Sequence, residues 1–156
     1  MGGEEIKLRL DKIKEDHTKI FEEIELLKIA LPLLDIEKKN NYVRKIINFF
    51  EKSIIQHFEY EENNLFSIAL VIGELEIKQV VRELQQEHIL ILSKLDKLKD
   101  IIFKYGFSFY DEKVEGEFMG LAKEAIELLL KNARKEDEEL FPYLEEKGMN
   151  IKKRFA

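Results

Sequence analysis

Apolar residues recur at alternating steps of three and four along almost the whole chain, and this spacing leaves few folds open. Only two prolines and seven glycines interrupt the 156 residues. A segment with this period buries one face of an α-helix, whereas a half-buried strand needs a period of two. Four such stripes can be followed, over residues 6–31, 43–68, 77–102 and 118–143. The sequence therefore predicts four long helices and no strand.

The expected helix ends coincide with residues that disfavour helical backbone. Pro32 disfavours helical conformation at Leu31, and the other three stripes end at or near glycines, which are Gly73, Gly106 and Gly148. Ser108 or Asp111 is a suitable N-cap for the fourth helix. Four amphipathic helices of about 25 to 35 residues with short connections pack as antiparallel neighbours. We therefore expect an all-α, up-down-up-down four-helix bundle that forms one domain over residues 1–156.

Gly116 and Gly120 lie four residues apart on one face of the fourth predicted helix. Each lowers helix stability by about 1 kcal/mol relative to alanine. Two interpretations stay open. Either a neighbouring helix approaches closely at this face, or the two glycines mark a late or frayed start of the helix.

Composition excludes several classes of partner and site. With 26 Lys and Arg against 32 Asp and Glu, the formal net charge of -6 repels phosphate backbones, so we expect no nucleic acid partner. No segment approaches the roughly 20 apolar residues of a membrane span, and the N-terminal residues do not resemble a signal peptide, so we expect a cytoplasmic protein. The absence of cysteine excludes thiolate metal sites and iron–sulfur clusters. Histidine and carboxylate remain as the metal ligands.

Polar residues interrupt every stripe near the middle of its helix; they are His17, His57 with Glu61, His88, and Asn132 with Glu136. A single histidine on an apolar face is more often a hydrogen-bonded core residue than a ligand. The chain has only three histidines, however, each on a different predicted helix. If a third of helical positions face the interior, chance places all three inward about one time in 27. His57 and His88 are about equally far from the turn between them, so they should share one level of the bundle.

Burial of several imidazoles and carboxylates without partners costs several kcal/mol, a large part of the net stability of a domain. A cation satisfies all of these groups at once. His57 and Glu61 also lie one helical turn apart on the same face, which is a chelating arrangement. The pattern therefore predicts a buried metal site with nitrogen and oxygen ligands.

These residues resemble the hemerythrin-like, or HHE cation-binding, domain family, over about residues 6 to 146. The resemblance is carried by His17, by the run HFEYEE at 57–62, by Glu87 and His88, and by the run RKEDEELFP at 134–142. It implies a four-helix bundle that holds two non-haem irons, bridged by carboxylates and an oxo or hydroxo group. It also implies that the protein carries or senses oxygen, or responds to iron, nitric oxide or redox state.

The chain departs from the family pattern at two positions. Hemerythrins have histidines where this chain has Leu92 in the third helix and Asn132 in the fourth. Leucine cannot ligate, and an asparagine carbonyl is a poorer iron ligand than imidazole. The expected ligands are therefore the three histidines, Glu61, and one of Glu136 or Asp137. Helix geometry favours Glu136, which shares a face with Asn132, whereas the resemblance favours Asp137.

Both carboxylates can bridge two metals, so two iron ions are favoured, and a single iron or zinc ion is the other possibility. The expected partners are metal ions and dioxygen or a similar small ligand. Binding or sensing is expected, not turnover of an organic substrate. The candidate walls of the site are Phe21, Phe50, Phe58 and Leu92.

Two alternatives stay open for the function. In the first, the bundle is a scaffold with a degenerate single-metal or empty site, in which Asn132 is hydrogen-bonded to a histidine. In the second, the site reduces peroxide or nitric oxide, with Tyr60 and Tyr143 as candidate donors. A ferritin-like carboxylate site is not expected, because no acidic residue precedes any histidine by three positions. The sequence does not indicate the oligomeric state.

Overall fold

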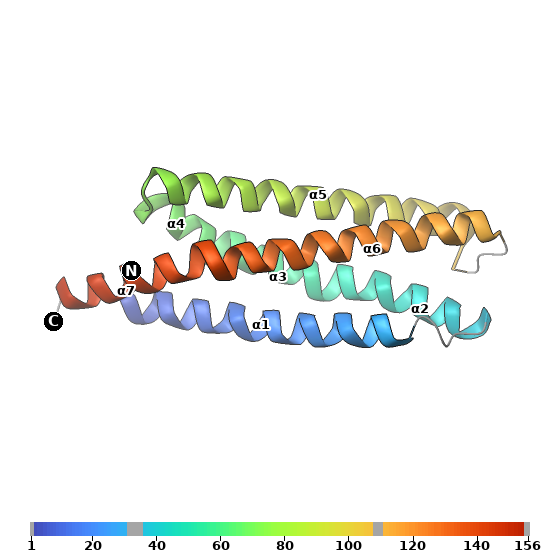
Figure 1. The fold of residues 1–156 in the computed structure, drawn as a ribbon, viewed down its shortest axis with the longest axis horizontal. Helices are drawn as coiled ribbons and strands as arrows, with labels where there is room; N and C mark the ends of the chain where they lie inside the picture. The colour runs from blue at the N-terminus through green and yellow to red at the C-terminus, as the bar shows by residue number, and fades with distance from the viewer. Residues whose placement is uncertain (1, 31–35, 108–110, 155–156) are drawn as a thin grey trace.

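A computed structural model describes residues 2–30, 36–107 and 111–154, and within these ranges all regular structure is helical. The helical segments form rods that lie side by side and alternate in direction, and both ends of the chain lie at the same end of the molecule (Figure 1). The predicted all-α four-helix bundle is confirmed. None of the helices in the described ranges is long and apolar enough to cross a membrane.

The first and third rods are uninterrupted α-helices, α1 (Gly3–Ala30) and α5 (Leu75–Tyr105). Both predicted stripes are confirmed where side chains are described, apart from one position at the end of α5. The buried residues of α1 are Ile6, Leu10, Ile13, His17, Ile20, Ile24 and Leu27. Those of α5 are Ile77, Val81, Leu84, His88, Ile91, Leu95, Leu98 and Ile101. The one difference is at the end of α5, where Ile101 is buried and Ile102 only partly so.

The second and fourth rods change helix type along their length. The second consists of α2 (Ile36–Asn48), η2 (Phe49–Ile54), α3 (Ile55–Glu61), η3 (Glu62–Phe66) and α4 (Ser67–Ile72). The fourth consists of α6 (Glu112–Lys135), η4 (Glu136–Leu140) and α7 (Phe141–Arg154). The three η segments are π-helical. Such segments are rare and frequently occur at functional sites.

Each π-helical segment brings two residues five positions apart to the same buried side of its rod. The buried pairs are Phe49 and Ile54, Glu61 and Phe66, and Glu136 and Phe141. An uninterrupted α-helix returns to the same face after three or four residues, so a spacing of five needs a wider turn. The sequence prediction of regular helices did not include these turns.

The buried face is displaced by one residue after the π-helical segments. Ala69 and Leu144 are fully buried there, whereas Ile68 and Tyr143 are half-buried. The stripe predicted with a constant α-helical period placed Ile68 and Tyr143 in the core. That prediction was wrong at these two positions, because the wider turns rotate the rest of the rod.

Most of the predicted helix ends in the described residues are confirmed. Gly73 follows α4 with extended backbone, and Gly106 follows α5 with a φ of 76°. Asp111 caps α6, because its Oδ1 accepts a hydrogen bond of 2.9 Å from the backbone of Lys113. The predicted end at Gly148 was wrong, since α7 continues to Arg154. The signals at residues 31–32 and 108 lie outside the described residues.

Gly116 and Gly120 both lie inside α6 and are exposed. A Cβ atom built on either residue would have nothing within 4 Å. The predictions of a close helix approach and of a late helix start are therefore both wrong. No helix among the described residues approaches this face, and the helix starts before it.

The core consists of two apolar clusters with a polar layer between them. One cluster contains Phe50 and Phe118, and the other contains Phe66 and Phe141. In α1 the boundary falls between Ile13 and Ile20, where His17 lies. The other three rods are interrupted at the same level by their own buried polar residues, so the layer crosses the whole bundle.

Candidate metal centre

The polar layer contains every buried polar side chain in the described part of the chain. All of them are at most 4% exposed; they are His17 of α1, His57 and Glu61 of α3, His88 of α5, Asn132 of α6 and Glu136 of η4. The sequence predicted each of these positions as inward-facing. The structure places His57 and His88 at the same level, as their distances from the turn between them predicted, and His17 lies at this level too.

Four of these residues form a compact group. His17, His57, Glu61 and Glu136 each contribute one nitrogen or oxygen atom, and these atoms lie within 4.8 Å of one another. His57 Nε2 is 2.5 Å from Glu61 Oε1, and His17 Nε2 is 3.7 Å from Glu136 Oε2. The two carboxylates come from different rods, so the group forms only when the bundle is folded.

His88 approaches the same two carboxylates. Its Nε2 atom is 4.0 Å from Glu61 Oε1 and 3.8 Å from Glu136 Oε1. Glu61 and Glu136 are thus each close to His88 and to one of the other two histidines. The two carboxylates therefore lie between the imidazoles of His17 and His57 on one side and the imidazole of His88 on the other.

The layer is short of hydrogen-bond partners. Seven buried side-chain atoms have none: both ring nitrogens of His17, Nε2 of His88, and all four carboxylate oxygens of Glu61 and Glu136. A buried polar atom without a partner costs about 1–3 kcal/mol, and more if it is charged. Converging imidazole nitrogens and carboxylate oxygens are the donor set of iron and zinc sites. The residues present therefore fit a cation.

Burial dominates the acid–base properties of the two carboxylates. It raises the pKa of Glu61 to about 8. Burial also raises the pKa of Glu136 well above its ordinary value, and the nearby charge of Glu61 raises it further. Without a cation, this pair therefore tends to hold protons near neutral pH.

The histidines are shifted in different directions. Burial lowers the pKa of His57. Burial also tends to lower the pKa of His88, but its interactions with the Glu136 and Glu62 carboxylates outweigh burial, so the pKa is raised. Three imidazoles next to protonated carboxylates form a site that can exchange protons for a metal ion.

Comparison with known proteins assigns the family. Residues 8–144 match the hemerythrin HHE cation-binding domain. The chain belongs to this family. No curated protein and no solved structure matches the chain. The buried cluster of His17, His57, Glu61 and Glu136 is therefore the candidate cation site of this HHE domain.

The two candidates for the carboxylate of the fourth rod occupy different positions in the HHE domain. The Glu136 side chain is completely buried in the layer, whereas that of Asp137 is 43% exposed. Asp137 Oδ1 lies 3.4 Å from His17 Nδ1, on the side of the ring away from Glu136. Asp137 thus approaches the site from outside, next to a histidine.

The two departures from the family pattern also differ in their surroundings. Asn132 is 1% exposed, and its Nδ2 atom donates to Glu87 Oε1 (3.3 Å) and to the carbonyl of Leu84 (3.5 Å). Its amide is therefore bound to α5 by a glutamate and a carbonyl group, not by a histidine as the scaffold interpretation supposed. Leu92 is partly buried and packs against the cluster that contains Phe50.

Aromatic rings surround the imidazoles of the HHE domain. Phe58 stacks on His88 with a centroid distance of 3.8 Å, and Phe66 lies on the same ring at 5.3 Å. Phe141 stacks on His17 at 5.6 Å, and Phe21 lies at 6.0 Å. Phe21 and Phe58 were predicted as walls. Phe66 and Phe141 were not, because Phe66 ends one π-helical segment and Phe141 directly follows another.

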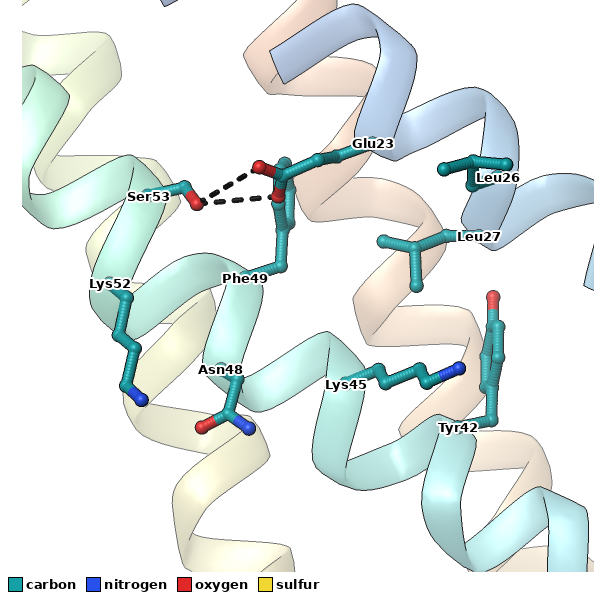
Figure 2. A pocket seen from close by; sticks show the side chains of 9 residues that line it. All are labelled: Glu23, Leu26, Leu27, Tyr42, Lys45, Asn48, Phe49, Lys52 and Ser53. Atoms are coloured by element: carbon teal, nitrogen blue, oxygen red, sulfur yellow. Dashed lines mark hydrogen bonds between the residues drawn. The ribbon is translucent and has the colours of Figure 1, made fainter. Parts of the chain in front are cut away.

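A groove between α1 and α3 reaches the edge of the layer. Its volume is about 370 Å³, and the lining includes His57, Asp16 and Tyr60. A second cavity of about 370 Å³ lies between α1 and the second rod, and its lining includes Leu27, Tyr42 and Phe49 (Figure 2). Glu23 and Ser53 line both spaces and are joined by hydrogen bonds of 3.3 and 3.4 Å. Of these two spaces, the groove is lined by a residue of the polar layer, His57, and the second cavity is not.

Proposed function

We propose that the polar layer binds two non-haem iron ions and that the protein uses them to bind or sense dioxygen or a related small ligand. One observation carries this proposal. Glu61 and Glu136 lie between His17 and His57 on one side and His88 on the other. A carboxylate has two oxygens and can bridge two cations, whereas a single ion would not need donors on both sides.

In this proposal His17 and His57 would hold one ion, His88 would hold the other, and the two glutamates would be shared between them. Bound iron supplies the redox chemistry and the affinity for dioxygen that the side chains lack. The chain itself orients the ligands, accepts or releases the protons that metal exchange requires, and keeps the layer dry with stacked phenylalanines.

The two metal positions are unequal. Leu92 and Asn132 stand where the family has histidines, and both lie on the rods that carry His88 and Glu136. An ion held by His88 would therefore have fewer nitrogen ligands from the protein, which would leave more room for water or a small ligand. We expect this ion to be bound more weakly and to be the more reactive of the two.

The surroundings of the layer favour binding or sensing over turnover of a large substrate. The groove at His57 reaches the layer, and its other walls include charged side chains of Lys12, Lys19 and Glu23. Small ligands fit such an entrance. Tyr143 is engaged elsewhere, because its hydroxyl accepts a hydrogen bond of 3.2 Å from the backbone of Glu74 at the start of α5. A cytoplasmic location stays a prediction.

Metal analysis combined with optical spectra tests the proposal. Protein expressed with iron and purified without chelator should contain about two iron ions per chain. Its aerobic spectrum should show the near-ultraviolet absorption of bridged ferric ions, and anaerobic reduction should remove this absorption. A Glu61→Gln, Glu136→Gln double variant is the control and should contain neither ion. One zinc ion in a colourless protein would contradict the dinuclear iron site, and a metal content near zero would leave only the scaffold alternative.

A further inference from the structure

Each of the four rods carries an acidic residue directly next to one of its buried polar residues. The adjacent pairs are Asp16 and His17, Glu61 and Glu62, Glu87 and His88, and Glu136 and Asp137. One acidic residue of each pair is only partly buried or is exposed, and we call it the outer residue of its rod. The outer residues are Asp16, Glu62, Glu87 and Asp137. Adjacent positions on a helix point about 100° apart, so each outer residue is directed towards a neighbouring rod.

The outer residues contact the imidazoles of the neighbouring rods at the nitrogen that faces away from the centre. Asp16 of α1 is 3.4 Å from Nδ1 of His57, and Glu62 of η3 is 3.1 Å from Nδ1 of His88. Asp137 of η4 is 3.4 Å from Nδ1 of His17, although without the alignment of a hydrogen bond. In all three histidines, the Nε2 atom faces the two buried glutamates.

Asn132 completes the same arrangement in the fourth rod. Its Nδ2 group donates to Glu87 of α5, the outer residue of the third rod. The contacts therefore run in one direction around the bundle, from the first rod to the second, the second to the third, the third to the fourth, and the fourth back to the first. Each rod supplies one outer acidic residue, and a histidine or asparagine of each rod contacts the outer acidic residue of the preceding rod.

Three of the outer residues are themselves held in place by other side chains. Lys12 Nζ lies 3.7 Å from Asp16, and Gln85 Nε2 donates to Glu62 at 3.0 Å. Lys135 Nζ lies 3.6 Å from Glu87. Such secondary contacts limit the rotation of the carboxylates.

We infer that Asp16, Glu62, Glu87 and Asp137 form a closed ring of positioning residues around the metal site. A neutral imidazole has one N–H group and one lone pair, and an ionised carboxylate can only accept a hydrogen bond. A carboxylate at Nδ1 therefore holds the proton there and leaves the lone pair of Nε2 directed at the centre. This inference rests on the proposed metal-binding function, but it concerns residues that do not touch the metal.

The ring also gives Asn132 a role. When its NH₂ group donates to Glu87, the carbonyl oxygen is the one remaining atom of the side chain that can ligate a cation. Asparagine thus preserves the outer contact that a histidine at this position would make. The substitution changes the ligand atom but leaves the ring intact.

Alanine variants of the four ring residues test this inference. Each should raise the dissociation constant for zinc about 10- to 100-fold, as loss of an outer partner does in other histidine sites. The matched controls are Glu15→Ala, Glu59→Ala and Glu138→Ala, which remove exposed acidic residues next to or near the ring. These controls should change the constant less than about twofold. Equal effects in ring and control variants would overturn the inference.

The proton position gives a second readout that does not require metal. Long-range ¹H–¹⁵N correlation spectra of the metal-free protein, recorded at a pH where the imidazoles are neutral, distinguish the two tautomers. We expect the Nδ1–H tautomer for all three histidines, and a mixture at His57 in Asp16→Ala and at His88 in Glu62→Ala. Nε2–H tautomers in the unsubstituted protein would refute the ring. If the unsubstituted protein had the expected tautomers but failed to bind zinc or iron, the proposed function would be wrong. The contacts of the ring residues with the imidazoles would then still be confirmed.

Discussion

Glu61 and Glu136 come from different rods, and each places a carboxylate oxygen within 4.8 Å of the other in a layer where neither side chain is exposed. None of their four oxygens has a hydrogen-bond partner. Two negative charges at this separation in a dry interior repel each other strongly. In the absence of a cation, protonation is the remaining way to reduce this repulsion, and this has consequences for stability.

The metal-free protein should lose stability as the pH rises from about 5 to about 8. The pKa of Glu61 is raised from 4.5 to about 8, and that of Glu136 is raised as well, so the folded state keeps protons that the unfolded state releases. Stability then falls with pH across this window. Zinc should restore it, and the increase in Tm on adding zinc should be larger at pH 8 than at pH 5. Thermal unfolding with and without zinc measures both effects.

The control for this prediction is the Glu61→Gln, Glu136→Gln double variant, whose metal-free Tm should depend much less on pH. The comparison is needed because the pKa of His57 is lowered, so this residue lowers stability as the pH falls below 6.5. That effect is present in both proteins. A metal-free Tm that is equally flat in the parent and in the double variant would show that the pair is not protonated.

Removal of the buried carboxylate of the fourth rod should weaken metal binding more than removal of its exposed neighbour. Glu136→Gln should reduce zinc affinity by more than the roughly 10- to 100-fold expected for loss of an outer partner, which is the effect predicted for Asp137→Ala. Glu136 is completely buried in the layer, and Asp137 contacts only the outer nitrogen of His17. Competition with a chelator measures both. A larger loss in Asp137→Ala would reverse their roles.

The sequence could predict most of the fold because the apolar period is nearly unbroken. In α1 and α5 the predicted and observed buried faces agree, since both helices are regular. In the second and fourth rods the predicted face was displaced after the π-helical segments, as at Ile68 and Tyr143. A wider turn has no residue signature in a single sequence; it is stabilised by the contacts that it allows, such as those of Phe66 and Phe141 with histidines.

The same reasoning explains which part of the site could be predicted. His17, His57 and His88 were recognisable because a polar residue in an apolar stripe is unusual. The outer residues Asp16 and Glu62 were not, because acidic residues on partly exposed helix positions are common and have no period of their own. Only the packing of the rods shows that each of them contacts an imidazole of the next rod.

A histidine at position 132 should strengthen the weaker of the two metal positions. Asn132→His replaces a carbonyl oxygen with an imidazole nitrogen, a better ligand for iron and zinc, and Glu87 is already in place to accept its second ring proton. We expect the affinity for the second ion to rise at least about tenfold, which corresponds to about 1.4 kcal/mol. A calorimetric titration with zinc measures this affinity. Met119→His, which adds a histidine to the same helix away from the layer, is the control and should leave both affinities unchanged.

Replacement of two exposed glycines should stabilise the bundle without affecting the site. Gly116 and Gly120 lie inside α6, and a Cβ atom at either has nothing within 4 Å. Alanine restricts the unfolded chain and favours helix, so each substitution should raise the free energy of unfolding of the metal-free protein by about 0.5–1 kcal/mol. Urea denaturation measures this. Gly106→Ala should do the opposite, because the φ of 76° at Gly106 is unfavourable for a residue with a Cβ atom. If alanine at 116 or 120 were destabilising instead, this face of α6 would have to be in close contact with another surface in solution, such as a second copy of the chain.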